Sequence, residues 1–145
     1  MEKKVVLLWL LTISFWGVSP IIEKVALRNV DPMLCLFVRT GVSLIVMALL
    51  LPLIPSFSVS KLLELSPKDY LFISLSGIIG GFLGMFCYFS MLKYESASKV
   101  VPLTATYPLV ATLLGILVLK ESLTLNKVLG TILVTLGIML LLKTP

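Results

Sequence analysis

The chain has 145 residues, of which 59% are hydrophobic and only 13% are charged. An average soluble domain carries about 25% charged residues, so this composition lacks the polar coat that a soluble fold needs. Disordered chains are rich in charge and poor in apolar residues, so disorder is excluded as well. The mean hydropathy of +1.13 indicates an integral membrane protein.

The charged residues and the cysteines exclude several classes of function. Twelve Lys and Arg against seven Asp and Glu give a net charge of +5, but the cations are scattered between apolar runs. A nucleic-acid partner would need a clustered basic surface, so we expect none. Two cysteines and no histidine offer neither a disulfide framework nor a metal site. Without a nucleophile–base pair, a phosphate loop or a carboxylate dyad, the sequence predicts no enzyme and no cofactor.

Apolar runs predict five membrane-spanning helices, because a bilayer core about 30 Å thick takes about 20 helical residues. Their ranges are 5–22, 33–54, 70–92, 100–119 and 127–143. The apolar part of the fifth is short, and Lys127 and Lys143 bracket it with side chains that reach the interfaces. A re-entrant fifth segment is the alternative. The predicted fold is an all-α five-helix bundle, a single domain over residues 1–145.

Two of these helices begin with capping signals. Asp31 precedes Pro32 at the start of the second helix, and Ser66 precedes Pro67 before the third, with Asp69 at the capping-box position. The stretch between Pro55 and Pro67 is predicted to be the longest loop.

Prolines interrupt the first and the fourth helices. A proline inside a helix removes one hydrogen bond and displaces the carbonyl four residues earlier. An unpaired carbonyl is costly in hydrocarbon, so it must face protein, water or a ligand. Transporters place binding sites at such interruptions, although a kink healed by a nearby Ser or Thr is the alternative. The prolines and the carbonyls that they free are Pro20 with Trp16, Pro102 with Ser98, and Pro108 with Thr104.

Arg39 is the charged residue predicted to lie deepest, about 10 Å into the second helix at the standard rise. A central arginine costs about 2.5–3.5 kcal/mol on insertion scales, so we expect it to face the bundle interior or a wet cavity. Glu23, Lys24 and Lys99 lie nearer to helix ends, where snorkelling to the interface explains them equally well. Glu121 follows the fourth helix and is expected to be a cap or a loop charge.

Glycines in the third helix form two overlapping G-x-x-x-G pairs, Gly77 with Gly81 and Gly80 with Gly84. Residues four apart share a helix face, and glycines there let two backbones approach closely. The pattern predicts close helix packing, either within the chain or with another subunit.

The lysines and arginines are almost evenly divided between the two sides of the membrane. Six lie on the N-terminal side of five spans, namely Lys3, Lys4, Lys61, Lys68, Lys120 and Lys127; five lie on the other, namely Lys24, Arg28, Lys93, Lys99 and Lys143. Orientation follows the asymmetry of positive charge in short loops, which is nearly absent here. Either the N-terminus lies weakly inside, or the chain inserts both ways and forms antiparallel pairs.

Several motifs together resemble an EamA domain of the drug/metabolite transporter superfamily. The first part offers Phe15-Trp16-Gly17, Lys24, Asp31-Pro32 and Arg39. The second part offers a run from Tyr94 to Leu103, then Tyr107-Pro108, Glu121-Ser122-Leu123-Thr124, Gly130 and Gly137. The resemblance covers essentially the whole chain, although usual members are similar to two such domains in tandem and in opposite orientations.

The resemblance implies a secondary transporter of small metabolites or drugs in the cell membrane. It places five residues near the substrate pathway: Trp16, Arg39, Lys99, Tyr107 and Pro108. With one domain in the chain, we expect a homodimer of half-size subunits, antiparallel if both orientations insert, with alternating access. The basic residues favour an anionic or zwitterionic solute. The rival hypothesis is an accessory membrane subunit that pairs with a different protein and transports nothing itself.

Overall fold

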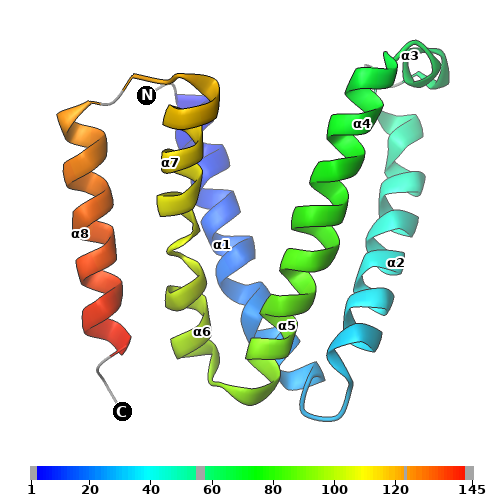
Figure 1. The fold of residues 1–145 in the computed structure, drawn as a ribbon. Helices are drawn as coiled ribbons and strands as arrows, with labels where there is room; N and C mark the ends of the chain where they lie inside the picture. The colour runs from blue at the N-terminus through cyan, green and yellow to red at the C-terminus, as the bar shows by residue number, and fades with distance from the viewer. Residues whose placement is uncertain (1–2, 55–57, 123, 143–145) are drawn as a thin grey trace. The chain divides into compact units, whose positions relative to one another are not determined.

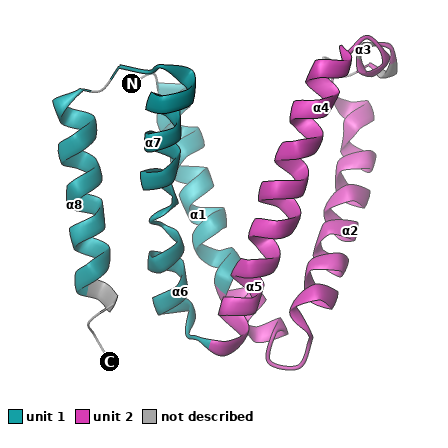
Figure 2. Cartoon of the chain, in the orientation of Figure 1, with its two compact units in different colours: residues 1–20, 95–145 teal, residues 21–94 magenta. Residues whose placement is uncertain are grey.

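The computed structural model describes residues 3–54, 58–122 and 124–142, and every regular element in those ranges is helical (Figure 1). The chain forms two compact units (Figure 2): unit 1 contains residues 1–20 and 95–145, and unit 2 contains residues 21–94. The first helix, α1 (Lys3–Ala26), contributes to both units, because the boundary follows Pro20.

Unit 2 contains the end of α1 and the elements of the second and third predicted helices. These are α2 (Pro32–Leu50), the 3₁₀ turn η1 (Leu51–Leu53), α3 (Val59–Leu63), α4 (Pro67–Ser76), η2 (Gly77–Gly84) and α5 (Met85–Tyr94). The predicted loop between Pro55 and Pro67 therefore contains a short helix, α3, whose N-cap is Ser58.

The predicted caps of α2 and α4 are confirmed. Asp31 Oδ1 accepts a hydrogen bond from the backbone N–H of Met33 at 2.8 Å. Ser66 Oγ accepts one from the N–H of Asp69 at 3.2 Å and donates its own hydrogen to Asp69 Oδ2 at 2.7 Å. Each cap satisfies a donor that the first helical turn leaves unpaired, so both helices begin where their sequence signals end.

The middle of the third predicted helix differs from expectation, because η2 is a π-helix rather than an α-helix. Its eight residues, GIIGGFLG, include the four glycines of the packing motif. Glycine lacks the side chain that holds a helix to one favoured geometry, so a glycine-rich stretch accommodates the wider i→i+5 turn more easily than others. A π segment inside an α-helix is rare and is often found at functional sites.

Unit 1 contains the first 20 residues of the chain and three later helices. These are α6 (Ala97–Thr104), α7 (Tyr107–Leu119) and α8 (Leu125–Leu142). The fourth predicted helix is thus divided at Ala105 and Thr106, and α7 begins with Tyr107 and Pro108. Pro20, in contrast, lies inside a continuous α1, so the interruption expected there does not end the helix.

Four stretches of the described residues are long and apolar enough to cross a membrane: Lys3–Ala26, Pro32–Leu53, Pro67–Tyr94 and Ala97–Leu119. The fifth, Leu125–Leu140, is a shorter apolar helix. Five spans therefore stay a prediction, and Lys143, the predicted end of the fifth, lies outside the described residues.

Most large apolar side chains of the described residues are exposed. The buried apolar ones are few: Leu27, Leu36, Phe89, Leu92, Val100 and Ile138. Exposed apolar area on this scale needs lipid or another protein to cover it. The buried group of unit 2 is where the charged residues gather.

Candidate functional site

An ion pair joins the first two helices of unit 2. Arg39 Nε lies 3.3 Å from Glu23 Oε1, and the Glu23 side chain is only 10% exposed. Glu23 lies one turn before the end of α1, and Arg39 lies two turns into α2. A carboxylate removed from water is stable only when it is paired or hydrogen-bonded. Arg39 supplies that pairing, and the carboxylate in turn lowers the cost of placing an arginine in an apolar helix.

An aromatic ring supports the same arginine. The guanidinium carbon of Arg39 lies 5.7 Å from the ring centroid of Phe89, which is fully buried on α5. This is within the range at which a cation is attracted to the face of an aromatic ring. Three helices therefore hold Arg39: α2 carries it, α1 pairs with it, and α5 packs under it.

The Arg39 side chain is 44% exposed despite these contacts. The ion pair with Glu23 is made at Nε, and the guanidinium also carries two terminal nitrogens. Those nitrogens form the planar fork that binds a carboxylate or phosphate through two parallel hydrogen bonds. Arg39 is thus held by Glu23 and Phe89 while its side chain stays partly exposed, which is the arrangement of a binding group.

Two lysines near this pair donate hydrogen bonds to carbonyls around the C-terminal ends of α1 and α5. Lys24 Nζ donates to the carbonyl of Leu92 at 2.7 Å, and Lys93 Nζ donates to the carbonyl of Val30 at 3.1 Å and also to that of Leu27. Each lysine therefore satisfies carbonyls at or just past the C-terminal end of the other helix. Cations at these ends also interact favourably with the helix dipoles.

These contacts correct the snorkelling interpretation of two charges. Glu23 does not extend to an interface, because its residue is 8% exposed and its carboxylate faces Arg39. Lys24 is directed to the carbonyls at the end of α5. Lys99 fits the interpretation better, because its side chain is 51% exposed and pairs with Glu95 one turn earlier on the surface of α6.

The other predicted pathway residues belong to unit 1. Tyr107 and Pro108 begin α7 just after the break, and both are exposed. Trp16 on α1 is 68% exposed. Within unit 1, no hydrogen bond, ion pair or ring contact between described residues joins any two of Trp16, Lys99, Tyr107 and Pro108.

Threonine hydroxyls take part in the break between α6 and α7. Thr104 Oγ1 donates to the carbonyls of Val100 and Val101, both at 3.0 Å, and Thr106 Oγ1 donates to that of Leu103 at 2.7 Å. These bonds satisfy carbonyls at the end of α6, as expected for a healed kink. The carbonyl of Thr104 still faces Pro108, which has no N–H to offer it.

The glycines of η2 are open to their surroundings. A Cβ atom built on Gly77, Gly80 or Gly81 would meet nothing within 4 Å, and one on Gly84 would meet only the carbonyl oxygen of Ile79, at 3.3 Å. The described residues therefore place no neighbouring helix against the first three glycines. Close packing at this face stays a prediction, and its partner would have to come from outside those contacts.

No metal site accompanies these residues: residues 3–54, 58–122 and 124–142 contain no group of three or more His, Cys, Asp or Glu side chains that could hold an ion.

Residues 3–143 match the EamA-like transporter family. The chain belongs to that family. It is 29% identical over 132 residues to an uncharacterized transporter from the region 3′ of cobO in a Sinorhizobium species, a match that covers 91% of this chain and 92% of the relative. It is 28% identical over 136 residues to an uncharacterized protein of Methanocaldococcus jannaschii, covering 94% of each. No solved structure matches the chain significantly.

Membership in the EamA-like transporter family confirms the resemblance seen in the sequence and makes the chain a multi-pass membrane protein of a transporter family. Each of the two relatives is nearly as long as this chain, since the matches cover 92% and 94% of their lengths. A unit of this size therefore recurs in both relatives.

Sequence reasoning found Arg39 but missed what holds it. Snorkelling explained Glu23 equally well, and no motif distinguished Phe89. A charge of opposite sign on the preceding helix was the available signal. The turn between α1 and α2 is short, so Glu23, one turn before it, and Arg39, two turns after it, lie close enough for their side chains to meet.

Proposed function

We propose that the chain transports small solutes across a membrane as a homodimer of half-size subunits. The observation that carries the proposal is the Glu23–Arg39 pair, a charged group held inside apolar helices with the arginine side chain 44% exposed. Charged residues within membrane helices are costly, and they are kept where an ion or a substrate passes. Membership in a transporter family supports the same conclusion.

The proposed pathway includes Trp16, Arg39, Lys99, Tyr107 and Pro108. Arg39 offers a partly exposed guanidinium, and Tyr107 and Pro108 begin a helix at a break, where transporters often bind their substrates. A guanidinium favours a solute with a carboxylate or another planar oxyanion, whether anionic or zwitterionic. Alternating access would follow from movement of one half of the dimer against the other.

Flux into liposomes tests this function. A panel of labelled solutes would contain matched sets that differ only in an end group: carboxylate, ammonium or hydroxyl. Arg39→Ala and Lys99→Ala should each abolish uptake without lowering the amount of protein in the membrane. Lys68→Ala, in the first turn of α4, is the matched control and should transport normally.

The outcomes separate transport from its substrate class. Uptake that prefers the ammonium or the hydroxyl solute would support transport but would refute the proposed preference for oxyanions. Normal uptake in both variants would refute the pathway.

The rival, an accessory subunit, would use the same open glycine face of η2 to pack against a different protein. Purification in mild detergent distinguishes the two. A stoichiometric unrelated partner without self-association would support the accessory role, and a homodimer would support the transporter.

A further inference from the structure

A groove of about 280 Å³ lies in unit 1 beside the break between α6 and α7. Ala105 and Leu109 line one wall, and Asn126, Lys127, Gly130 and Val134 line the other, along one face of α8. From Asn126 to Val134 the helix rises about 12 Å at the standard 1.5 Å per residue. The groove therefore extends from the first turn of α8 well into the apolar part of that helix.

The deeper part of the groove is mainly apolar, with Thr131 as its polar residue, and glycine keeps it open. A Cβ atom on Gly130 would meet nothing within 4 Å, so the missing side chain leaves space that no other described residue fills. The neighbouring side chains of α8 are apolar and exposed, including Leu129, Ile132 and Leu133. In a membrane helix such a surface faces acyl chains or protein, and an open space beside it is filled by one of them.

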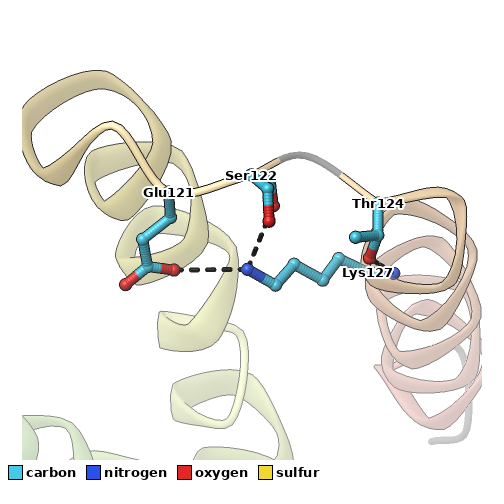
Figure 3. Close-up of polar contacts among 4 residues, drawn as sticks. All are labelled: Glu121, Ser122, Thr124 and Lys127. Atoms are coloured by element: carbon cyan, nitrogen blue, oxygen red, sulfur yellow. Dashed lines mark hydrogen bonds and ion pairs between the residues drawn. The ribbon is translucent and has the colours of Figure 1, made fainter.

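The mouth of the groove carries positive charge. Lys127 Nζ lies 3.3 Å from Glu121 Oε2 and donates to the carbonyl of Ser122 at 3.1 Å (Figure 3). Its side chain remains 41% exposed. Lys120 directly precedes Glu121 in the chain, so the segment from Lys120 to Lys127 contains two lysines and one glutamate. Thr124 Oγ1 accepts a hydrogen bond from the N–H of Lys127 at 3.3 Å at the start of α8, where the positive end of the helix dipole also favours an anion (Figure 3).

The negative charge of Glu121 partly neutralises Lys127 at the mouth of the groove. Lys120 adopts a left-handed conformation with φ 54°, which turns the chain back after α7. The N–H of Glu121 then donates to the carbonyl of Gly115 at 3.2 Å, and its carboxylate lies over Gly115, 3.4 Å from where a Cβ atom would be. The anchored Glu121 carboxylate therefore compensates the charge of one lysine. Lys120, Glu121 and Lys127 together keep one net positive charge.

We propose that this groove binds a phospholipid with an anionic headgroup. The headgroup would lie at Lys127 and the first turn of α8, and an acyl chain would follow the groove past Gly130 to Val134. Charge complementarity selects an anionic lipid over a zwitterionic one, and the apolar length beyond the charge selects a lipid over a free anion. The groove shares Pro108 and the neighbouring helix break with the proposed pathway, but Trp16, Arg39, Lys99 and Tyr107 do not line it, and lipid binding is measured without transport.

Competition between two lipids that differ only in the headgroup tests the proposal. Purified protein in mild detergent would be mixed with equal amounts of phosphatidylglycerol and phosphatidylcholine of the same acyl chains, and bound lipid would be counted by native mass spectrometry. The wild-type chain should bind phosphatidylglycerol about fivefold more than phosphatidylcholine, the usual effect of one lysine near an anionic headgroup.

Opposite changes at Glu121 and Lys127 separate a lipid site from a merely structural turn. Lys127→Gln should reduce the preference to about one, whereas Glu121→Gln should raise it by about the same factor, because it removes the offsetting charge. Both substitutions break the same ion pair, so a role limited to folding would move both values in one direction and overturn the proposal.

Two further variants complete the design. Gly130→Leu should fill the groove and reduce the binding of both lipids, and Lys99→Gln, a lysine outside the groove, should leave the preference unchanged. Equal binding of the two lipids by the wild-type chain would show that the headgroup charge does not select the lipid. A loss of preference in Lys99→Gln as large as that in Lys127→Gln would show general charge attraction. Either result would overturn the site. Loss of self-association in Gly130→Leu with unchanged lipid binding would show that a second copy covers the groove.

Discussion

Individual charges in this chain are held by specific partners rather than by solvent. The Glu23–Arg39 pair is an ion pair between two helices, with one member buried and the other half-exposed. Breaking a buried pair by removing one partner costs about 3–5 kcal/mol, because it leaves an uncompensated charge. The exposed tip of Arg39 reduces that cost, since solvent or headgroups can reach it.

A double-mutant cycle at these two positions measures the pairing. Glu23→Gln and Arg39→Gln should each destabilise the fold by about 1–3 kcal/mol, and the double variant by less than their sum. Unfolding by SDS titration in mixed micelles gives the free energies. Strict additivity would show that the two side chains do not interact in the folded protein.

The two capping lysines allow a comparison with a surface lysine. Lys93→Met removes the hydrogen bonds to the carbonyls of Leu27 and Val30, so it should cost about 1–2 kcal/mol. Lys99→Met removes only an exposed pair with Glu95, so it should cost less than about 0.5 kcal/mol. The same SDS titration ranks them, and equal losses would contradict a capping role for Lys93.

Among the elements, the third and the fourth membrane stretches depart from a regular helix, the third by a π segment and the fourth by a break. The glycine spacing predicted a packing face, but nothing in it predicted the π geometry of η2, because spacing reports the face and not the hydrogen-bond pattern. The break in the fourth stretch was predictable, since Pro108 cannot donate to Thr104. The exact residues of the break, Ala105 and Thr106, depend on threonine hydroxyls whose bonds are visible only in three dimensions.

Bulky side chains on the glycine face test whether it is an interface. Gly77→Leu and Gly81→Leu have room in the described chain, so the subunit should fold normally while self-association in membranes falls by tenfold or more. Energy transfer between labelled copies measures the association, and Ile79→Leu in the same segment is the control. Unchanged association in both glycine variants would remove this face from the proposed dimer.

For the whole molecule, composition and hydrophobic run length predicted the class, since they depend on the bilayer and not on contacts. The helix ranges agree within a few residues, because Asp31 and Ser66 mark their starts locally. The partners of Arg39 could not be read from periodicity, because Glu23 and Phe89 come from different helices. The sequence therefore identified Arg39 itself, whereas its contacts with Glu23 and Phe89 are visible only in the folded structure.

Orientation in the membrane is the prediction that belongs to the whole molecule. With positive charge nearly balanced, reporters on the C-terminus that signal only inside or only outside should both give signal. Adding two lysines next to Lys3 should shift the signal strongly to one side. A single-sided signal in the unmodified chain would exclude dual insertion and a self-sufficient antiparallel pair.

The π segment also sets how far α5 is rotated about the helix axis relative to α4. Each residue of an α-helix turns the chain by about 100°, and a π turn takes up one residue more than an α turn, so converting η2 to α geometry at unchanged length would rotate everything after it by about that angle. Phe89 and Lys93 follow η2 and would lose alignment with Arg39 and the end of α1. An alanine inserted directly after Gly84 would rotate Phe89 and Lys93 by that angle, so it should destabilise the fold far more than Ile79→Ala does, as SDS titration would show. The π segment would then determine which side of α5 faces the Glu23–Arg39 pair.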